Sequence, residues 1–175
     1  MHKRIKPLEP PDSHHLRAAL GWLELGNVVE ANEELERISP TLRTHPAVLA
    51  VRYEVYSRTK QWDAAAEIAG TQVKLTAEDP GAWISLAYAT RRKPGGGIPQ
   101  AREILIQAQP KFPDQSLIPY NLACYECQLG NLAEAWQWLE KAFAIGGTRQ
   151  MKKMALDDLD LQPLWEKLKE TRAPA

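Results

Sequence analysis

The sequence predicts an all-α fold, an α-solenoid of about four helix–turn–helix units closed by a C-terminal pair of capping helices. Apolar and small residues recur at three- and four-residue steps, as on one face of a helix. Gly, Asn, Asp and Pro stand where helices are expected to start and end. A small residue followed four positions later by an apolar one returns at Ala31, Ala65, Ala101 and Ala135, at steps of 34, 36 and 34 residues.

The composition limits the classes of function. The chain has 175 residues, with 22 Lys and Arg against 22 Asp and Glu, so its formal net charge is zero. This length can bury a core, and a neutral balance gives no general attraction to nucleic acid or anionic membranes. The sequence has no run of about 18 apolar residues, and no apolar run follows its charged N-terminus. We therefore expect a cytoplasmic protein.

The predicted order is a flexible Pro-rich N-terminal segment, four helix–turn–helix units, and capping helices with a tail. These parts cover residues 1–11, then about 12–43, 44–78, 79–113 and 114–147, then 148–175. Helices are expected at about 13–25, 28–38, 47–59, 62–77, 80–90, 98–109, 117–129, 132–145, 149–156 and 161–171.

Each unit begins at a residue that can cap a helix, because short polar side chains accept hydrogen bonds from the free N–H groups of the first turn. In the first unit this residue is Asp12 or Ser13, and in the later units it is Thr44, Asp79 and Asp114. In the second and third units a Pro follows within two positions, and Pro is tolerated in a first turn.

The turn inside each unit also has a local signal. Gly26-Asn27 and Gly130-Asn131 pair a Gly, which can end a helix in the left-handed conformation, with an Asn that can cap the next helix. Lys60-Gln61 takes this place in the second unit. In the third unit the turn is residues 91–97, whose three glycines are too flexible for a helix and account for the longer step of 36 residues.

The C-terminal part is expected to close the open end of the fourth unit. A short helix follows Gly146-Gly147, and Asp160 is predicted to cap the last helix. A short solenoid needs such a cap, with an apolar inner face and a polar outer face. The apolar face consists of Leu156, Leu159, Leu161, Leu164, Trp165 and Leu168.

The period and the helix–turn–helix unit are typical of tetratricopeptide repeats (TPRs). Trp83-x2-Leu86-Ala87-x2-Thr90 is similar to the W-x2-L-G-x2-Y opening of that repeat. Over about residues 13–147 the sequence resembles this family, although Arg52 and Tyr53 replace its usual Leu and Gly. The resemblance implies a right-handed superhelix.

In this family the first helix of each unit generally lines a concave groove that holds a partner peptide or helix. The resemblance therefore implies a protein-interaction module or adaptor. The positions that would face the groove are Leu16, Leu20, Leu23, Ala50, Glu54, Ser57, Arg58, Ile84, Tyr88, Arg91, Arg92, Tyr120, Cys124, Cys127 and Gln128.

The residue types at these positions indicate what the groove would bind. Members that clamp a C-terminal carboxylate of heat-shock chaperones place Lys and Asn along these faces, and neither residue occurs here, so that activity is not expected. Apolar and aromatic side chains beside Arg58, Arg91 and Arg92 favour a hydrophobic segment with some acidic character. Alternatively, the leucines are core and the arginines are solvated.

Two other classes of function compete with the adaptor. A structural module would oligomerise through its end faces, with a groove that is empty or filled by residues 1–11. A weaker possibility is a nucleic-acid binder that uses Arg91–Lys93 and Arg149–Lys153. We expect a protein or peptide partner, with a homo-oligomer as the alternative, and neither a membrane nor a small-molecule substrate.

Two motifs suggest metal or redox chemistry. Cys124-x-x-Cys127 supplies two of the four ligands that structural zinc needs. It lies in the middle of a predicted helix, whereas a redox motif gains reactivity from a helix N-terminus. We therefore interpret both cysteines as buried or groove-lining. His14 and His15 are adjacent, so they do not share a helix face and are expected at the surface.

Two further patterns are also given a structural interpretation. Asp157, Asp158 and Asp160 lack the Gly and Glu positions of a calcium loop, which favours a capping role. Residues 95–97 lack the Lys and the preceding strand of a phosphate loop. No nucleophile, base and acid occur together in a recognisable pattern. The sequence therefore predicts no catalytic residue, no metal site, no cofactor and no enzyme.

Overall fold

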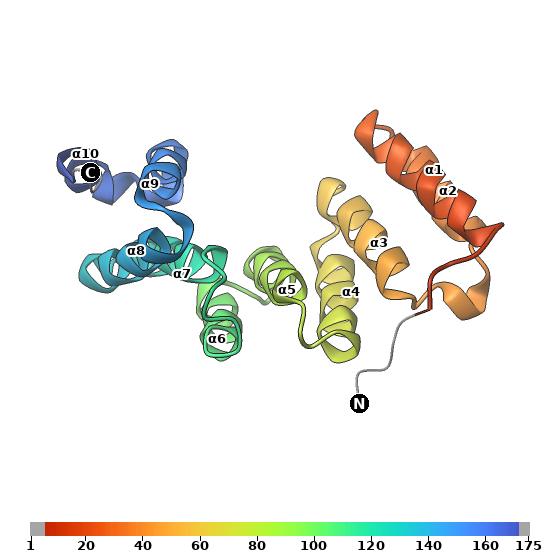
Figure 1. The fold of residues 1–175 in the computed structure, drawn as a ribbon, viewed down its shortest axis with the longest axis horizontal. Coiled ribbons are helices and arrows are strands. Elements are labelled where there is room, and N and C mark those ends of the chain that lie inside the picture. Colours follow the sequence, from red (N-terminus) through yellow and green to blue (C-terminus); the bar gives the residue numbers. More distant parts are fainter. Residues whose placement is uncertain (1–5, 172–175) are drawn as a thin grey trace.

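The computed structural model describes residues 6–171, and within them the chain forms ten α-helices, two short 3₁₀ helices and no strand. The helix pairs follow one another along the longest axis, from α1 and α2 to α9 and α10 (Figure 1). This is the all-α solenoid that the sequence predicts. None of the described helices is long and apolar enough to cross a bilayer.

The pairs occur in chain order. The α-helices are α1 Asp12–Glu24, α2 Val28–Arg37, α3 Pro46–Arg58, α4 Trp62–Leu75, α5 Pro80–Arg92, α6 Ile98–Ala108, α7 Leu117–Gln128, α8 Leu132–Gly146, α9 Thr148–Asp157 and α10 Trp165–Glu170; the 3₁₀ helices are η1 Pro40–Leu42 and η2 Leu159–Leu164. Each predicted unit range contains two consecutive α-helices. The exact division of the chain into units stays a prediction.

The cap predictions for α2 and α5 are confirmed. The Asn27 side chain accepts a hydrogen bond from the Glu30 N–H at 3.2 Å, and the Asp79 carboxylate accepts one from the Gly81 N–H at 2.8 Å. Asp12 or Ser13 was expected to cap α1, which is wrong, because Pro11 stands at the cap position and no side chain caps this helix. The Asp12 carboxylate instead accepts hydrogen bonds from the Ser39 N–H and hydroxyl, at 2.6 and 3.1 Å. Asp12 therefore ties the start of α1 to the chain after α2.

Three further cap predictions are wrong for local reasons. His45, not Thr44, caps α3, because its Nδ1 accepts from the Ala47 N–H at 3.2 Å. The chain from Asp114 makes a turn before α7 begins, so Ser116 stands at the cap position there. Asn131 stands before α8 but does not cap it with its side chain.

The last predicted helix is also shorter than expected. Residues 159–164 form the 3₁₀ helix η2, and only six residues form α10. Pro163 lies inside η2 and has no N–H to donate, which is unfavourable in the interior of an α-helix. Asp158, not Asp160, is the cap, because its carboxylate accepts from the Asp160 N–H at 3.0 Å.

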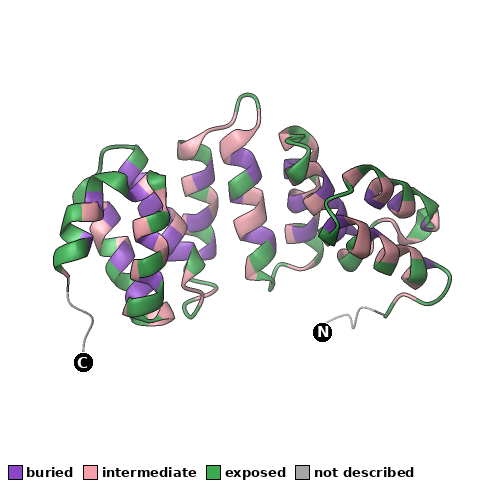
Figure 2. Ribbon diagram, turned by 90° about the horizontal axis from the view of Figure 1, so that it is seen from above, coloured by how far each residue is buried: buried purple, intermediate pink, exposed green. Residues whose placement is uncertain are grey.

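The buried side chains form two main clusters with a small one between them. The N-terminal cluster joins α1, α2 and α3, and the C-terminal cluster joins α5 to α10. Between them Ala65, Ala66 and Ala89 form a small cluster where α4 meets α5. Figure 2 shows buried residues along the whole array.

The N-terminal segment was expected to be flexible. Residues 1–5 lie outside the described part of the chain. Leu8 packs against the N-terminal cluster, and the Lys6 carbonyl accepts a hydrogen bond from Nε2 of His45 at 2.9 Å. These contacts favour a fixed position for residues 6–11, and the flexibility of the whole segment stays a prediction.

The two unusual residues of α3 connect neighbouring units. Nη1 of Arg52 donates to Oε1 of Glu36 at 2.7 Å, and the Tyr53 hydroxyl donates to the Ser85 carbonyl at 3.1 Å. The Arg52 hydrogen bond lowers the pKa of Glu36, although burial opposes it. Arg52 and Tyr53 therefore make polar contacts between units at the two positions where tetratricopeptide repeats usually have a Leu and a Gly.

A buried carboxylate connects α6, α7 and α8. The Glu126 side chain is fully buried, and its two oxygens accept from Nε of Arg102 and from Nδ2 of Asn131, the latter at 2.8 Å. Arg102 also donates to Glu134 at 3.0 Å. The hydrogen bond to Glu126 raises the pKa of Arg102, although burial opposes it.

Candidate partner-binding groove

The chain itself fills the C-terminal end of the predicted groove. Both terminal nitrogens of Arg91 donate to the carboxylate of Asp160, one of them at 2.9 Å. The Tyr120 hydroxyl donates to Oδ2 of Asp158 at 3.0 Å, and Nε2 of Gln128 donates to the Asp160 carbonyl at 2.9 Å. Residues of α5 and α7 that were predicted to meet a partner thus hold the start of η2.

This arrangement corrects the expectation for the fourth unit. Tyr120, Cys124 and Cys127 are only 5, 3 and 4% exposed, so they do not line an open groove. Leu161 and Leu164 are buried in the same C-terminal cluster. The segment after α9 is therefore part of the core and not a loosely bound segment.

The electrostatics of this end favour neutral thiol and phenol groups. Burial raises the pKa of Cys124, and the carboxylate of Asp158 adds to the effect. Burial also raises the pKa of Tyr120, and it raises that of Tyr125 to about 12. The hydrogen bond to Asp160 raises the pKa of Arg91, which lies 5.5 Å from the ring centroid of Tyr125.

The structure brings together two motifs that the sequence presented separately. Cys124 and the carboxylates of Asp158 and Asp160 have potential metal-ligand atoms within 4.8 Å of one another. Each carboxylate already accepts hydrogen bonds, Asp158 from Tyr120 and Asp160 from Arg91. The Arg91 cation balances one of the two negative charges. We interpret the cluster as the connection between the C-terminal segment and α7.

The cysteine motif fits its structural interpretation. Cys124 and Cys127 are both free and buried. Burial raises the pKa of each thiol, whereas a reactive cysteine needs a lowered pKa. These cysteines behave as small apolar residues of the core.

In the first three units some of the residues predicted to line the groove are exposed and others are buried. Leu20 and Tyr88 are 45 and 39% exposed, and Ala50 is also exposed. Leu16 and Ile84 are half-buried and pack against the N-terminal and C-terminal clusters, respectively. Leu23 is core, and Ser57 is half-buried. The interpretation of the leucines as core therefore holds for one of the three.

The arginines of the open part differ from one another. Nε of Arg58 donates to Glu54 at 2.7 Å, and its Nη1 donates to the Leu23 carbonyl. Arg92 instead stacks on aromatic rings, with its guanidinium carbon 3.4 Å from the ring centroid of Tyr88 and 5.5 Å from that of Trp62. Neither side chain is simply solvated.

Parts of the two basic runs are used within the chain. Arg91 binds Asp160, and Nζ of Lys152 donates to the Thr171 carbonyl at 2.6 Å. Among the adjacent histidines, Nδ1 of His15 lies 2.7 Å from Oε2 of Glu34. The contacts of Arg91 and Lys152 leave fewer free charges in the two basic runs than the sequence indicated.

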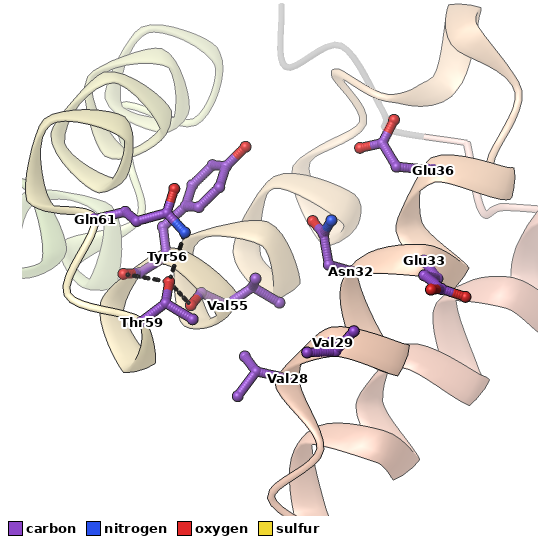
Figure 3. A pocket seen from close by; sticks show the side chains of 9 residues that line it. All are labelled: Val28, Val29, Asn32, Glu33, Glu36, Val55, Tyr56, Thr59 and Gln61. Atoms are coloured by element: carbon purple, nitrogen blue, oxygen red, sulfur yellow. Dashed lines mark hydrogen bonds between the residues drawn. The ribbon is translucent and has the colours of Figure 1, made fainter.

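A cleft between α2 and α3 was not predicted. It encloses about 500 Å³ and is lined by Val28 and Val29 on one side and by Val55, Tyr56 and Gln61 on the other (Figure 3). Thr59 donates to the Val55 carbonyl at 2.8 Å, which holds one wall. No sequence pattern pointed to this cleft, because its width depends on the spacing between two units.

A comparison with solved structures finds chains of the same fold. Neither a scan against models of protein families nor a search of curated proteins finds a match. Among solved structures, the thermophilic TPR protein TTC0263 of Thermus thermophilus is similar, at 18% identity and a TM-score of 0.65, over 90% of this chain and 95% of that one.

Nearly identical TPR-like repeats of a Podosopora anserina protein assigned as a kinesin light chain are also similar. They share 22% identity with this chain at a TM-score of 0.62, over 93% of this chain and 96% of theirs. A form of the same repeats with one substituted residue gives 21% identity and a TM-score of 0.63.

Proposed function

We propose that this chain, which has the tetratricopeptide-repeat fold, is a non-catalytic module that holds a partner peptide or helix against α1, α3 and α5. The observation that carries the proposal is the exposure of Leu20, Ala50 and Tyr88 on these helices, at positions that face the groove in the resembling family. The corresponding face of α7 is covered by η2, so we place the partner over the first three units. The proposed compartment is the cytoplasm.

A photo-crosslinking amino acid tests the position of the partner. One variant carries it at Ala50, in the proposed groove, and a control variant carries it at Glu103 on α6. Both positions are exposed. We expect a polypeptide from the source lysate to be crosslinked at Ala50 and not at Glu103. Loss of this product in a Leu20→Glu/Tyr88→Ala variant would assign the contact to the groove. Equal products at both sites, or a product at Glu103 alone, would contradict the proposal.

Self-assembly is the second candidate. Leu25 and Val29 are largely exposed around the α1–α2 turn, at the end of the array that has no capping helices within the described residues. Such apolar side chains could bind a second copy. Sedimentation velocity over a hundredfold range of concentration tests this candidate. A concentration-dependent mass that Leu25→Glu/Val29→Glu abolishes would support it, and a constant monomer mass would exclude it.

A further inference from the structure

Arg92 differs from the other arginines of the described chain that are buried or partly buried. Within residues 6–171 its side chain forms no ion pair with a carboxylate. Each of the others does, and these are Arg43, Arg52, Arg91 and Arg102. A partly desolvated guanidinium without a carboxylate is a place where an acidic ligand gains a charge-assisted hydrogen bond.

Aromatic rings hold this guanidinium in place. It stacks on Tyr88, and Trp62 meets Tyr88 edge to face with ring centroids 5.8 Å apart. Nη1 of Arg92 also donates to the Tyr88 carbonyl at 3.0 Å. Stacking covers the faces of a guanidinium and leaves N–H groups at its edge, which match the two oxygens of a carboxylate. Arg92 is therefore ordered before any ligand arrives.

The space beside Arg92 can accept such a group. A hollow of about 440 Å³ is lined by Lys60, Gln61, Trp62, Asp63, Ala64, Arg92 and Pro94. Lys60 supplies a second cation and Asp63 one carboxylate, and neither forms an ion pair among the described residues. The hollow therefore has an excess of positive charge. Trp62 and Pro94 offer apolar surface to a residue next to the acid.

The neighbouring residue shows how a polypeptide acid binds at this end of α5. Arg91 holds Asp160 through two nitrogens, and Gln128 binds the backbone of the same residue. The acid there belongs to the chain's own segment. Arg92, one position further on α5, has the same functional group and no such occupant within the described residues.

We propose that Arg92 is the anchor for an Asp or Glu side chain of the partner polypeptide, with Tyr88 and Trp62 fixing the guanidinium and Lys60 adding a second positive charge. This inference rests on the proposed function and specifies the chemistry of the partner. Nucleic acid fits less well, because three carboxylates lie close to this end of α5. Asp157, Asp158 and Asp160 line a separate hollow at the start of η2, and Arg91, the residue before Arg92, binds Asp160. A strand of phosphates that continued past Arg91 would be repelled there, whereas one acidic side chain would not.

A random peptide library tests the chemistry directly. Twelve-residue peptides displayed on phage are selected on the immobilised full chain. The peptide that binds most tightly is then synthesised in its selected form and in variants in which each Asp or Glu is replaced by Asn or Gln. We expect Asp and Glu to be enriched, and one amide replacement to weaken binding at least tenfold. Arg92→Gln should weaken binding of the acidic peptide by a similar factor, and binding of the amide peptide hardly at all.

Matched variants keep this result interpretable. Arg149→Gln makes the same change at an exposed arginine on α9 and should leave the affinity unaltered. Arg92→Lys keeps the charge without the planar fork, so it should bind with intermediate affinity even if Arg92→Gln melts early. A charge reversal, Arg92→Glu, should favour a peptide in which Lys replaces the critical acid.

The possible outcomes separate the two proposals. Peptides that bind the Ala50→Glu variant more weakly, but bind the Arg92→Gln variant as tightly as the wild type, would overturn this inference and leave the proposal of groove binding intact. Selected peptides without acid enrichment would overturn it in the same way. If the folded chain enriches no peptide, both proposals fail.

Discussion

The ion pair between Arg102 and Glu126 gives the sharpest prediction for stability. We consider Arg102→Met, which keeps most of the apolar stem of the arginine and removes its charge. The Glu126 carboxylate is fully buried and would keep a single side-chain donor, Nδ2 of Asn131. Removing one partner of a buried pair leaves an uncompensated charge, which typically costs about 3–5 kcal/mol.

The structure places this variant at the lower end of that range. The Arg102 side chain is 31% exposed, so water can reach the place it leaves. With a cost of about 3 kcal/mol and a shift of roughly 2–4 °C per kcal/mol for a chain of this size, the melting temperature should fall by about 6–12 °C. Urea unfolding followed by circular dichroism measures the free energy, and a thermal scan measures the midpoint.

Two controls identify the cause. Glu126→Gln in the Arg102→Met background removes the buried charge and should restore much of the stability. Glu134→Gln removes only the more exposed partner of Arg102 and should cost less than about 1 kcal/mol. A loss below about 1 kcal/mol in Arg102→Met, or no recovery in the double variant, would refute the view that Glu126 is a buried charge held by Arg102.

Three other predictions concern the C-terminal segment, the cysteines and the first junction. Asp160→Asn should speed hydrogen exchange of η2 by roughly ten- to a hundredfold, because a charge-assisted hydrogen bond contributes roughly 1.5–3 kcal/mol; unchanged exchange would contradict the role of Arg91. Cys124 and Cys127 should react with a thiol reagent at mildly alkaline pH only as fast as the chain opens, since burial raises the pKa of both; rapid labelling of the native chain would disprove this. Glu36 has a lowered pKa, so its contribution to stability is present above the pKa of an unfolded Glu and is lost as the pH falls through the folded value. The difference in urea stability between wild type and Glu36→Gln should therefore shrink on acidification, and a constant difference would count against the Arg52 pair.

The fold could be predicted from the sequence because its signals are local. Caps such as Asn27 and Asp79 act within one turn of a helix, and the repeat of about 34 residues places the same contacts in each unit. Asp12 shows where this reasoning ends. Its side chain has the right chemistry for a cap, but donors 27 residues away at Ser39 bind it instead.

The groove could be predicted only in part for a similar reason. A position within a repeat indicates which way Tyr120 or Gln128 points, but not what covers it. The covering residues, Asp158 and Asp160, lie 38 and 32 positions later and were interpreted as helix caps. The one signal in the sequence that could have predicted this cover was charge, since Asp158 and Asp160 lie beyond the last unit and either could have been paired with Arg91.

The small alanine cluster between α4 and α5 bears on how the chain unfolds. Ala65, Ala66 and Ala89 bury only methyl groups, and the half-buried Tyr53, Tyr56 and Trp62 pack against them, so no large side chain is fully buried in this cluster as in the clusters on either side. In a repeat array the interfaces between units transmit cooperativity. A weak interface there would let the N-terminal helices open while α5 to α10 stay folded, so the chain is expected to melt in two steps instead of one. A partner lying across α1, α3 and α5 would bridge that junction and merge the two steps into a single transition.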